Sequence, residues 1–143
     1  MLIMKIYDAT DQILGRIATC IAKDLLKGET VHIVNCEKAV ISGNPKVIKE
    51  HYLHRVQRGD PHHGPFFPRT PHGIVKRTIR GMIPFSKPKG QDAFRRLRVF
   101  IGVPDDIKDK NFIRIEEADV NKLRCKHISL GDLSLALGHE KRW

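Results

Sequence analysis

The sequence lacks the features of a membrane or secreted protein. No apolar run approaches the ~18 residues that a membrane-spanning helix requires. The apolar start at 1–7 is too short for the core of a signal peptide and has no small-residue cleavage site, so we expect a cytoplasmic protein. The three cysteines have spacings that match no zinc or CxxC motif. We expect Cys20, Cys36 and Cys125 to be reduced thiols that act as small apolar residues.

Catalytic motifs are equally scarce. The sequence contains no GxSxG, P-loop or GxGxxG motif. General acid–base catalysis needs paired carboxylates or a His–acid couple, and adjacent Glu116 and Glu117 would point in opposite directions on a strand. We therefore expect no enzyme activity, no cofactor, no bound metal and no small-molecule substrate.

The histidines leave one alternative open. His51 and His54 are three residues apart on a predicted helix, and His62 and His63 follow in a loop. A metal site needs three or four converging ligands, and only Asp60 supplies a carboxylate at ligand spacing. A metal-dependent hydrolase that processes RNA is thus the alternative. The surrounding cations favour histidines that face RNA or solvent.

Charge is distributed very unevenly along the chain. The 26 Lys and Arg residues exceed the 16 Asp and Glu residues, which gives a formal net charge of +10. Residues 46–98 hold 13 of the cations and three of the acids, so the remainder is neutral. A localised positive field indicates a polyanionic partner, with nucleic acid first and an anionic membrane second. A membrane is disfavoured because no long helix carries large apolar residues opposite its cations.

The hydrophobic pattern predicts an α/β fold. With 143 residues and 41% hydrophobic content, residues 1–143 are enough for one domain with its own core. A strand at 3–8, a helix at 13–26 and a strand at 31–36 predict a βαβ unit with parallel strands. Residues 39–41 are expected to form a short strand or the edge of a turn. Further strands are expected at 98–102 and 112–115, and further helices at 45–57, 71–81, 91–97 and 129–138. We expect a three-layer α/β/α architecture, with a small mixed or parallel sheet and helices on both faces.

A long loop is predicted at about 58–72. This segment contains four prolines, two glycines and three histidines, and it shows no periodic pattern. Loops of this length in a compact domain are usually functional or disordered. We expect the loop to become ordered against a partner. A second, basic loop is expected at 85–90.

The predicted helix at 71–81 is amphipathic, with an almost purely cationic polar side. Arginine supplies bidentate forks for phosphate and lysine supplies point charges. The candidate RNA-binding residues are Arg55, Arg58, His62, His63, Arg69, Lys76, Arg77, Arg80, Lys87, Lys89, Arg95, Arg96 and Arg98. Phe66, Phe67 and Phe85 either stack on unpaired bases or form a small core under the loop. Gly15-Arg16 would present backbone N–H groups to a phosphate, although close helix–sheet packing explains Gly15 equally well.

Four segments, in order, resemble a known protein family. Residues 8–18 (DATDQILGRIA) resemble the "DAxxxxLGRxA" opening of the ribosomal protein L13 (uL13) family, and residues 34–44 (VNCEKAVISGN) resemble its "VNAEKxxxSGN" segment. Residues 77–84 (RTIRGMIP) are similar to its "xxxxRGMLP" run, and residues 96–102 (RLRVFIG) to its "RLKVYxG" strand. Residues 40–44 and 69–71 follow the archaeal and eukaryotic pattern. Cys36 stands where the family commonly has Ala.

The resemblance implies a three-layer α/β/α fold and a structural role in the large ribosomal subunit. It implies binding to 23S-type rRNA during subunit assembly, with neighbouring large-subunit proteins as further partners and the cytoplasmic ribosome as location. The family's motifs place the RNA contacts on Arg77, Arg80, the loop at 87–89, Arg96 and Arg98. The charge distribution selects the same region independently.

Overall fold

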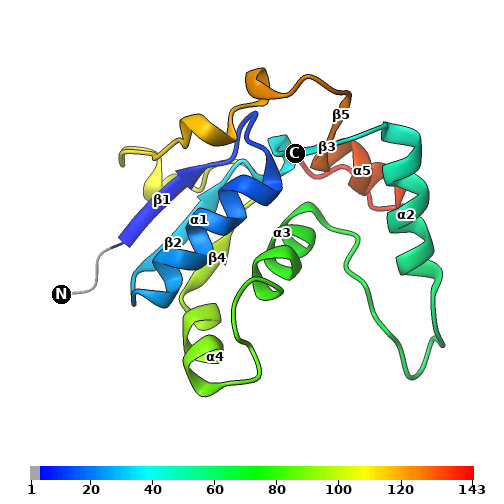
Figure 1. Ribbon diagram of the computed structural model, residues 1–143, viewed down its shortest axis with the longest axis horizontal. Helices are drawn as coiled ribbons and strands as arrows, with labels where there is room; N and C mark the ends of the chain where they lie inside the picture. The colour runs from blue at the N-terminus through cyan, green and yellow to red at the C-terminus, as the bar shows by residue number, and fades with distance from the viewer. Residues whose placement is uncertain (1–3) are drawn as a thin grey trace.

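The structure, a computed structural model, describes residues 4–143 (Figure 1). Strand β1 (Met4–Asp8), helix α1 (Leu14–Leu26) and strand β2 (Thr30–Val34) form the predicted βαβ unit. β1 and β2 are parallel, with Tyr7 opposite Ile33. α1 ends where predicted, because Gly28 follows its last turn with φ +99°, in the left-handed region that favours glycine.

Within residues 4–143, five strands form two small sheets, which confirms the predicted α/β class. Strand β4 (Leu97–Val99) pairs in parallel with β2, so the first sheet has the order β1-β2-β4. Strand β3 (Val40–Ser42) pairs antiparallel with β5 (His127–Ser129). The strand expected at 98–102 is thus shorter and starts one residue earlier. The strand expected at 112–115 is reduced to a single bridge between Ile113 and Tyr7.

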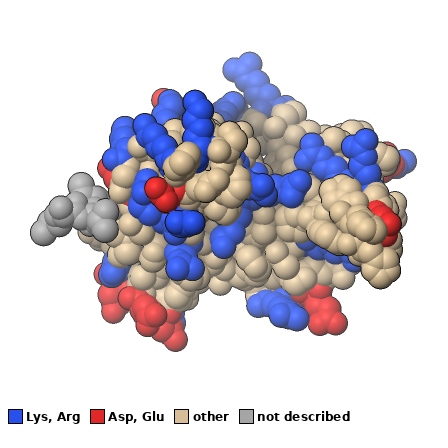
Figure 2. Space-filling model, turned by 90° about the horizontal axis from the view of Figure 1, so that it is seen from below, with Lys and Arg blue, Asp and Glu red and all other residues tan. Residues whose placement is uncertain are grey.

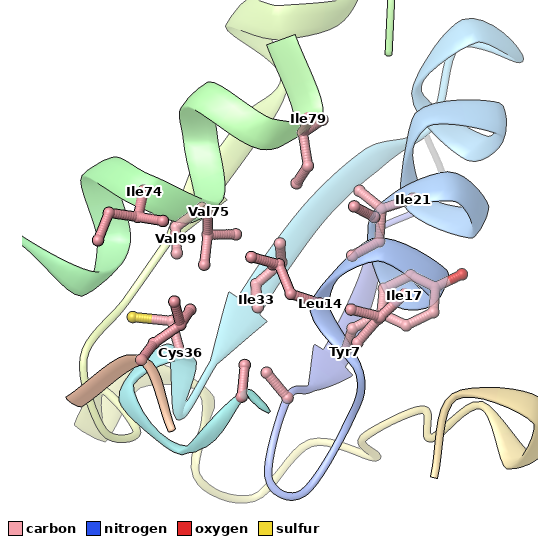
Figure 3. Packing of buried hydrophobic residues seen from close by; sticks show 14 of the residues in the cluster. Tyr7, Leu14, Ile17, Ile21, Ile33, Cys36, Ile74, Val75, Ile79 and Val99 are labelled. Carbon is pink, nitrogen blue, oxygen red and sulfur yellow. The ribbon is translucent and has the colours of Figure 1, made fainter. Parts of the chain in front are cut away.

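The main core lies between the three-stranded sheet and the helices on one of its faces. Leu14, Ile17 and Ile21 of α1 point toward the sheet, and α3 (Pro71–Arg80) packs beside them (Figure 3). The sheet contributes buried Tyr7, Val31, Ile33, Leu97 and Val99 to this core. Every second strand residue faces these helices, as the two-residue period of a strand requires.

A thinner layer covers the opposite face of the sheet. Ile6 and Val34 pack there against Ile107 of the 3-10 helix η2 (Asp105–Ile107), with Phe100 and Phe112 alongside. The chain then returns through the 3-10 helices η3 (Glu116–Ala118) and η4 (Val120–Lys122). The two covering layers are therefore unequal, with α-helices on one side and short 3-10 turns with coil on the other.

The C-terminal segment belongs to the main core. Helix α5 (Leu130–Ala136) begins directly after β5, with the Ser129 hydroxyl accepting the backbone N–H of Asp132 at 3.2 Å. Leu130, Leu133 and Leu137 are buried among residues of the first half of the chain. The helix and its cap are as predicted, whereas β5 has no counterpart in the expected elements.

Helices α2 (Pro45–Gln57) and α3 both begin with a capping residue followed by proline. The Asn44 side chain accepts the N–H of Lys46 at 3.1 Å, and the Thr70 hydroxyl accepts that of Gly73 at 3.2 Å. α4 (Pro88–Arg95) also begins at a proline. The prediction of a loop at 85–90 followed by a helix from 91 is therefore wrong at 88–90.

The cysteines are all free, and their environments differ. Cys36 is fully buried in the core, at the start of the 3-10 helix η1 (Cys36–Lys38). Cys20 is partly exposed, and Cys125 is exposed. The prediction that all three act as small apolar residues is thus wrong for Cys125. None of the helices within residues 4–143 combines the length and the apolar character needed to cross a bilayer.

Candidate nucleic-acid interface

The candidate RNA-binding residues lie on α2, α3, α4, β4 and the loop between α2 and α3. All of them are exposed except Lys76 and Arg96, which are partly buried. Figure 2 views the molecule from below and shows Lys and Arg on two lobes and beside the hollow between them. α4 and the loop between α2 and α3 lie at the lower edge of Figure 1 and so face the viewer in Figure 2.

Four side chains from three elements form a compact group, which we call the Phe67 cluster: Tyr52, Arg55, Phe67 and Arg77. The Arg77 guanidinium lies 5.0 Å from the centre of the Phe67 ring, and that of Arg55 lies 5.7 Å from it. Arg55 also lies 5.6 Å from the centre of Tyr52, whose ring meets Phe67 edge-on at 5.8 Å. Cation–π contacts of this kind hold both guanidinium planes in place. Burial raises the pKa of the Tyr52 hydroxyl, which stays neutral at physiological pH.

Three arginines near the Phe67 ring have no carboxylate partner within the described part of the chain. Arg55, Arg58 and Arg77 join no ion pair there. Their donors are therefore available to an external anion, and forked guanidinium donors suit phosphate oxygens.

A second cationic group surrounds Phe85 and the start of α4. The Arg80 guanidinium lies 4.2 Å from the centre of the Phe85 ring, which packs edge-on against Phe94 at 5.4 Å. Lys87 and Lys89 are exposed at the first turn of α4. Arg95 differs from them because it lies 3.5 Å from the Asp92 carboxylate, three residues earlier on the same helix.

The loop between α2 and α3 is organised around Asp60. Its carboxylate accepts the backbone N–H of His62 at 2.8 Å and lies 3.2 Å from Nδ1 of His63. These two contacts hold the pKa of Asp60 below its usual value, the His62 N–H having the larger effect. The backbones of Asp60 and Gly64 exchange two hydrogen bonds, so residues 60–64 close into a tight turn. Arg69 is anchored at the far end, where its carbonyl accepts the Ser134 hydroxyl at 2.5 Å.

The three candidate phenylalanines differ in exposure and in packing. Phe67 and Phe85 are partly buried and pack against other side chains of the protein. Phe66 retains 69% of its surface exposed. Of the three, Phe66 therefore has the largest surface available to a partner.

The two arginines of the β4 region differ from the rest. Arg96 is partly buried, and its guanidinium donates to the carbonyl oxygen of Leu25 at 2.7 Å, at the C-terminal end of α1. Arg98 is exposed on the opposite side of the strand from buried Leu97 and Val99. The structure therefore gives Arg96 a stabilising contact that sequence reasoning did not anticipate.

The histidines do not form a metal site. Among residues 4–143, no group of three or more His, Cys, Asp or Glu side chains is placed to hold a metal ion. His51 and His54 are exposed on α2, and the His51 ring lies against Tyr52 at 5.8 Å. The alternative of a metal-dependent hydrolase therefore has no centre in this part of the chain.

Sequence reasoning missed several residues that border the Phe67 cluster. A hollow of about 430 Å³ is lined by that cluster together with Ile74, Thr78, Gly81 and Met82. The helical period assigns Tyr52 only to the apolar side of its helix. Its spacing of three residues from Arg55 places both on one helix face and is the signal that could have found it.

Gly15 is exposed at the start of α1. Apart from its chain neighbours and the adjoining backbone of α1, no atom of residues 4–143 would lie within 4 Å of a Cβ at this position. The explanation of Gly15 by close helix–sheet packing is therefore wrong.

The chain matches one protein family over most of its length. Residues 3–106 match the family described as Ribosomal protein L13. The large ribosomal subunit protein uL13 of Sulfurisphaera tokodaii is 47% identical over 137 residues, which cover 93% of each chain. That of Methanosarcina barkeri is 46% identical over 137 residues, covering 94% of this chain and 98% of the relative. That of Methanopyrus kandleri is 44% identical over 138 residues, covering 94% and 87%.

These three relatives are archaeal, as the predicted motif pattern indicated, and the identity extends beyond the residues that the family description covers. The charge distribution, the α/β fold and the four ordered motifs agree with the match. The chain therefore belongs to the ribosomal protein L13 family.

Proposed function

We propose that this protein is a structural, non-catalytic component of the large ribosomal subunit in the cytoplasm. It binds 23S-type rRNA through the exposed cations of residues 46–98 and helps the subunit to assemble. Neighbouring large-subunit proteins are its further partners. The single observation that carries the proposal is the localisation of the whole net charge of +10 in a segment whose arginines largely lack carboxylate partners.

Several features of the site support this role over catalysis. Folded RNA is recognised largely through its shape, phosphates and 2′-hydroxyl groups, which need cations on a scaffold of fixed geometry. α3 supplies such a scaffold, because Ile74, Val75 and Ile79 are buried while Arg77 and Arg80 are exposed. The expected mechanism is binding of phosphates by the cations, with release of counterions from the RNA. The loop at 58–72 is expected to become ordered when it binds the RNA.

The proposal is tested by removing two cations of α3. The variant Arg77→Ala with Arg80→Ala should bind large-subunit rRNA more weakly without unfolding. The slope of log K against log salt concentration should become shallower by about 0.7–0.9 for each phosphate that the variant no longer neutralises. Fluorescence anisotropy over a salt series measures both quantities, and circular dichroism checks the fold.

A matched control removes two cations from the neutral part of the chain. Arg124 and Lys126 are both exposed and join no ion pair within residues 4–143. The variant Arg124→Ala with Lys126→Ala should leave affinity and salt slope nearly unchanged. Equal losses of affinity in both double variants, or no loss in the α3 variant, would contradict the proposed surface.

The identity of the RNA is tested separately by UV crosslinking in cell extract. Peptides from residues 46–98 should crosslink to large-subunit rRNA. Crosslinks from other peptides would mean that rRNA is the partner but that the binding surface lies outside residues 46–98. Recovery of no rRNA would overturn the proposed function.

A further inference from the structure

We infer that the groove between α2 and α3 binds an unpaired, single-stranded segment of RNA whose bases stack on the Phe67 cluster. This inference rests on the proposed function and specifies the form of RNA that this part of the surface takes. It distinguishes the groove from the cations of α4, which are expected to contact phosphates of either form.

The groove consists of three adjoining hollows of about 340, 430 and 400 Å³. The first two share Arg55, Phe67 and Arg77, and the second and third share Tyr52 and Thr78. The three hollows therefore adjoin one another, from Arg58 at one end to Arg16 at the other. A row of adjoining hollows suits consecutive nucleotides of a strand.

The electrostatics of the groove favour a polyanion. Arg16, Arg55, Arg58 and Arg77 line the three hollows, and no Asp or Glu is found among the described residues of their walls. A fourth hollow of about 390 Å³ shares Arg58, Pro65 and Phe67 with the first and adds Asp60 beyond that end. Arg16 donates one hydrogen bond to the carbonyl of Glu117 at 2.9 Å, and this contact fixes its position at the end of the groove. The phosphates of a strand that follows the groove would thus meet a guanidinium group at each end and in the middle.

The planar groups of the groove distinguish single-stranded from double-stranded RNA. A duplex keeps its bases stacked inside and presents phosphates and sugars, so aromatic surfaces add little to its binding. Unpaired bases stack on aromatic rings and on guanidinium planes. Here Arg55 lies 5.6 and 5.7 Å from the ring centres of Tyr52 and Phe67, and Arg77 lies 5.0 Å from that of Phe67. The exposed guanidinium planes of the two arginines, backed by these partly buried rings, are therefore the surfaces on which a base would stack.

The α2 wall of the groove is well suited to accommodate a strand. No residue of α2 is buried, and its contact with the core is made by partly buried Ile48, Tyr52 and Val56.

A larger hollow, about 960 Å³, lies elsewhere and is lined by Asp11, Glu37 and Asp132 as well as by Lys38 and Lys49. Its mixed charge gives it no preference for a polyanion.

The test compares one labelled RNA in two forms, with the full-length protein. A mixed-sequence strand of ~10 nucleotides, within the range of single-strand site sizes, is used alone and annealed to its complement. The single strand should bind about tenfold more tightly than the duplex. Arg55→Lys keeps the charge and removes the planar group, so it should weaken single-strand binding about fivefold and duplex binding less than about twofold.

Arg124→Lys is the matched control, because Arg124 is an exposed arginine outside the groove and outside residues 46–98. It should leave single-strand binding unchanged.

A second measurement needs no variant. The same strand carrying 4-thiouridine should crosslink to peptides that contain Tyr52, Phe67 or Met82.

Equal affinity for both RNA forms, no effect of Arg55→Lys, or crosslinks confined to α4 would each overturn the groove as a single-strand site. If the variant Arg77→Ala with Arg80→Ala then still weakens binding of both forms, the proposed function stands without this inference. If the protein binds neither RNA form, both are overturned.

Discussion

Gly90, in the first turn of α4, lies directly against the carbonyl group of Pro84. A Cβ atom at position 90 would overlap that carbonyl and would lie 2.9 Å from the backbone nitrogen of Phe85. Gly90 is buried, and its backbone conformation is helical. The glycine is therefore required for a close approach of two backbone segments and not for an unusual φ angle.

Gly90→Ala should lower the free energy of unfolding by about 3 kcal/mol, the upper part of the range for forced overpacking. The backbone at 84–85 cannot yield like a flexible side chain, and its displacement would also shift Arg80 and Phe85. Urea unfolding followed by circular dichroism measures the change.

Gly15→Ala is the control for the Gly90 prediction. Gly15 lies in α1, and among the described residues only its chain neighbours and the helix backbone itself could lie within 4 Å of a Cβ placed there. Alanine should therefore stabilise the protein by about 0.5–1 kcal/mol through its higher helix propensity. A loss of stability at Gly15 similar to that at Gly90 would contradict the packing argument.

Arg96→Ala should destabilise the folded state independently of RNA. The variant removes a charge-assisted hydrogen bond to the Leu25 carbonyl, at the negative end of the α1 dipole. Bonds of this type contribute about 1.5–3 kcal/mol to the free energy of unfolding. Arg98→Ala, two residues along the same strand and exposed, should change it by less than about 0.5 kcal/mol. The same urea titration, without RNA, compares the two.

His32 should make stability depend on pH in the mildly acidic range. The side chain lies on the thinly covered face of the sheet, opposite Arg98 on β4 and edge-on to Phe100 at 5.6 Å. Burial lowers the pKa of His32 below its ordinary value of 6.5, and the charges of Lys110 and Arg98 lower it further. The unfolded chain therefore binds a proton more readily than the folded one, so stability falls as the pH drops below about 6.5.

His32→Gln should reduce this pH dependence. Unfolding free energies measured at about pH 7.5 and about pH 5 should differ less in the variant than in the natural protein. A smaller dependence of the same sign should remain, because burial and then the Lys76 charge also lower the pKa of His72. An identical pH dependence in both proteins would show that His32 is protonated equally readily in the folded state.

Cys36 and Cys125 should react with thiol reagents at very different rates. Burial, with the neighbouring Glu37 charge, raises the pKa of Cys36 to about 12, so almost no thiolate forms at neutral pH. Cys125 is exposed and should react quickly with Ellman's reagent. Cys125→Ser should remove a fast phase that Cys36→Ser leaves intact. Disappearance of that phase in the Cys36 variant would contradict the prediction.

Local signals in the sequence predicted most helices well. Asn44-Pro45 and Thr70-Pro71 fix the starts of α2 and α3, because capping and the fixed φ of proline act within a few residues. The predicted start of α4 is three residues late. Lys87 precedes the proline and provides no capping side chain, so the helix start has no capping signal. In the sequence Gly90 indicates a loop, and only the structure shows that it is a helical residue packed against the Pro84 carbonyl.

The pairing of distant segments could not be predicted from the sequence. The strand β5 has only three residues, and its partner β3 lies more than 80 positions earlier in the chain, so no local pattern marks it. The same limitation applies to Arg96. As a residue type it resembles every other cation of the segment, and only folding brings it to the carbonyl of Leu25.

The sequence by itself determined the α/β class, the family and the concentration of cations in residues 46–98. The hydrophobic period, the motifs and the charge distribution depend only on the order of the residues. Only the tertiary structure decided which of those cations face outward together. Arg55 on α2 and Arg77 on α3 both lie close to the centre of the Phe67 ring, at 5.7 and 5.0 Å, since packing sets the distance between elements that are remote in sequence.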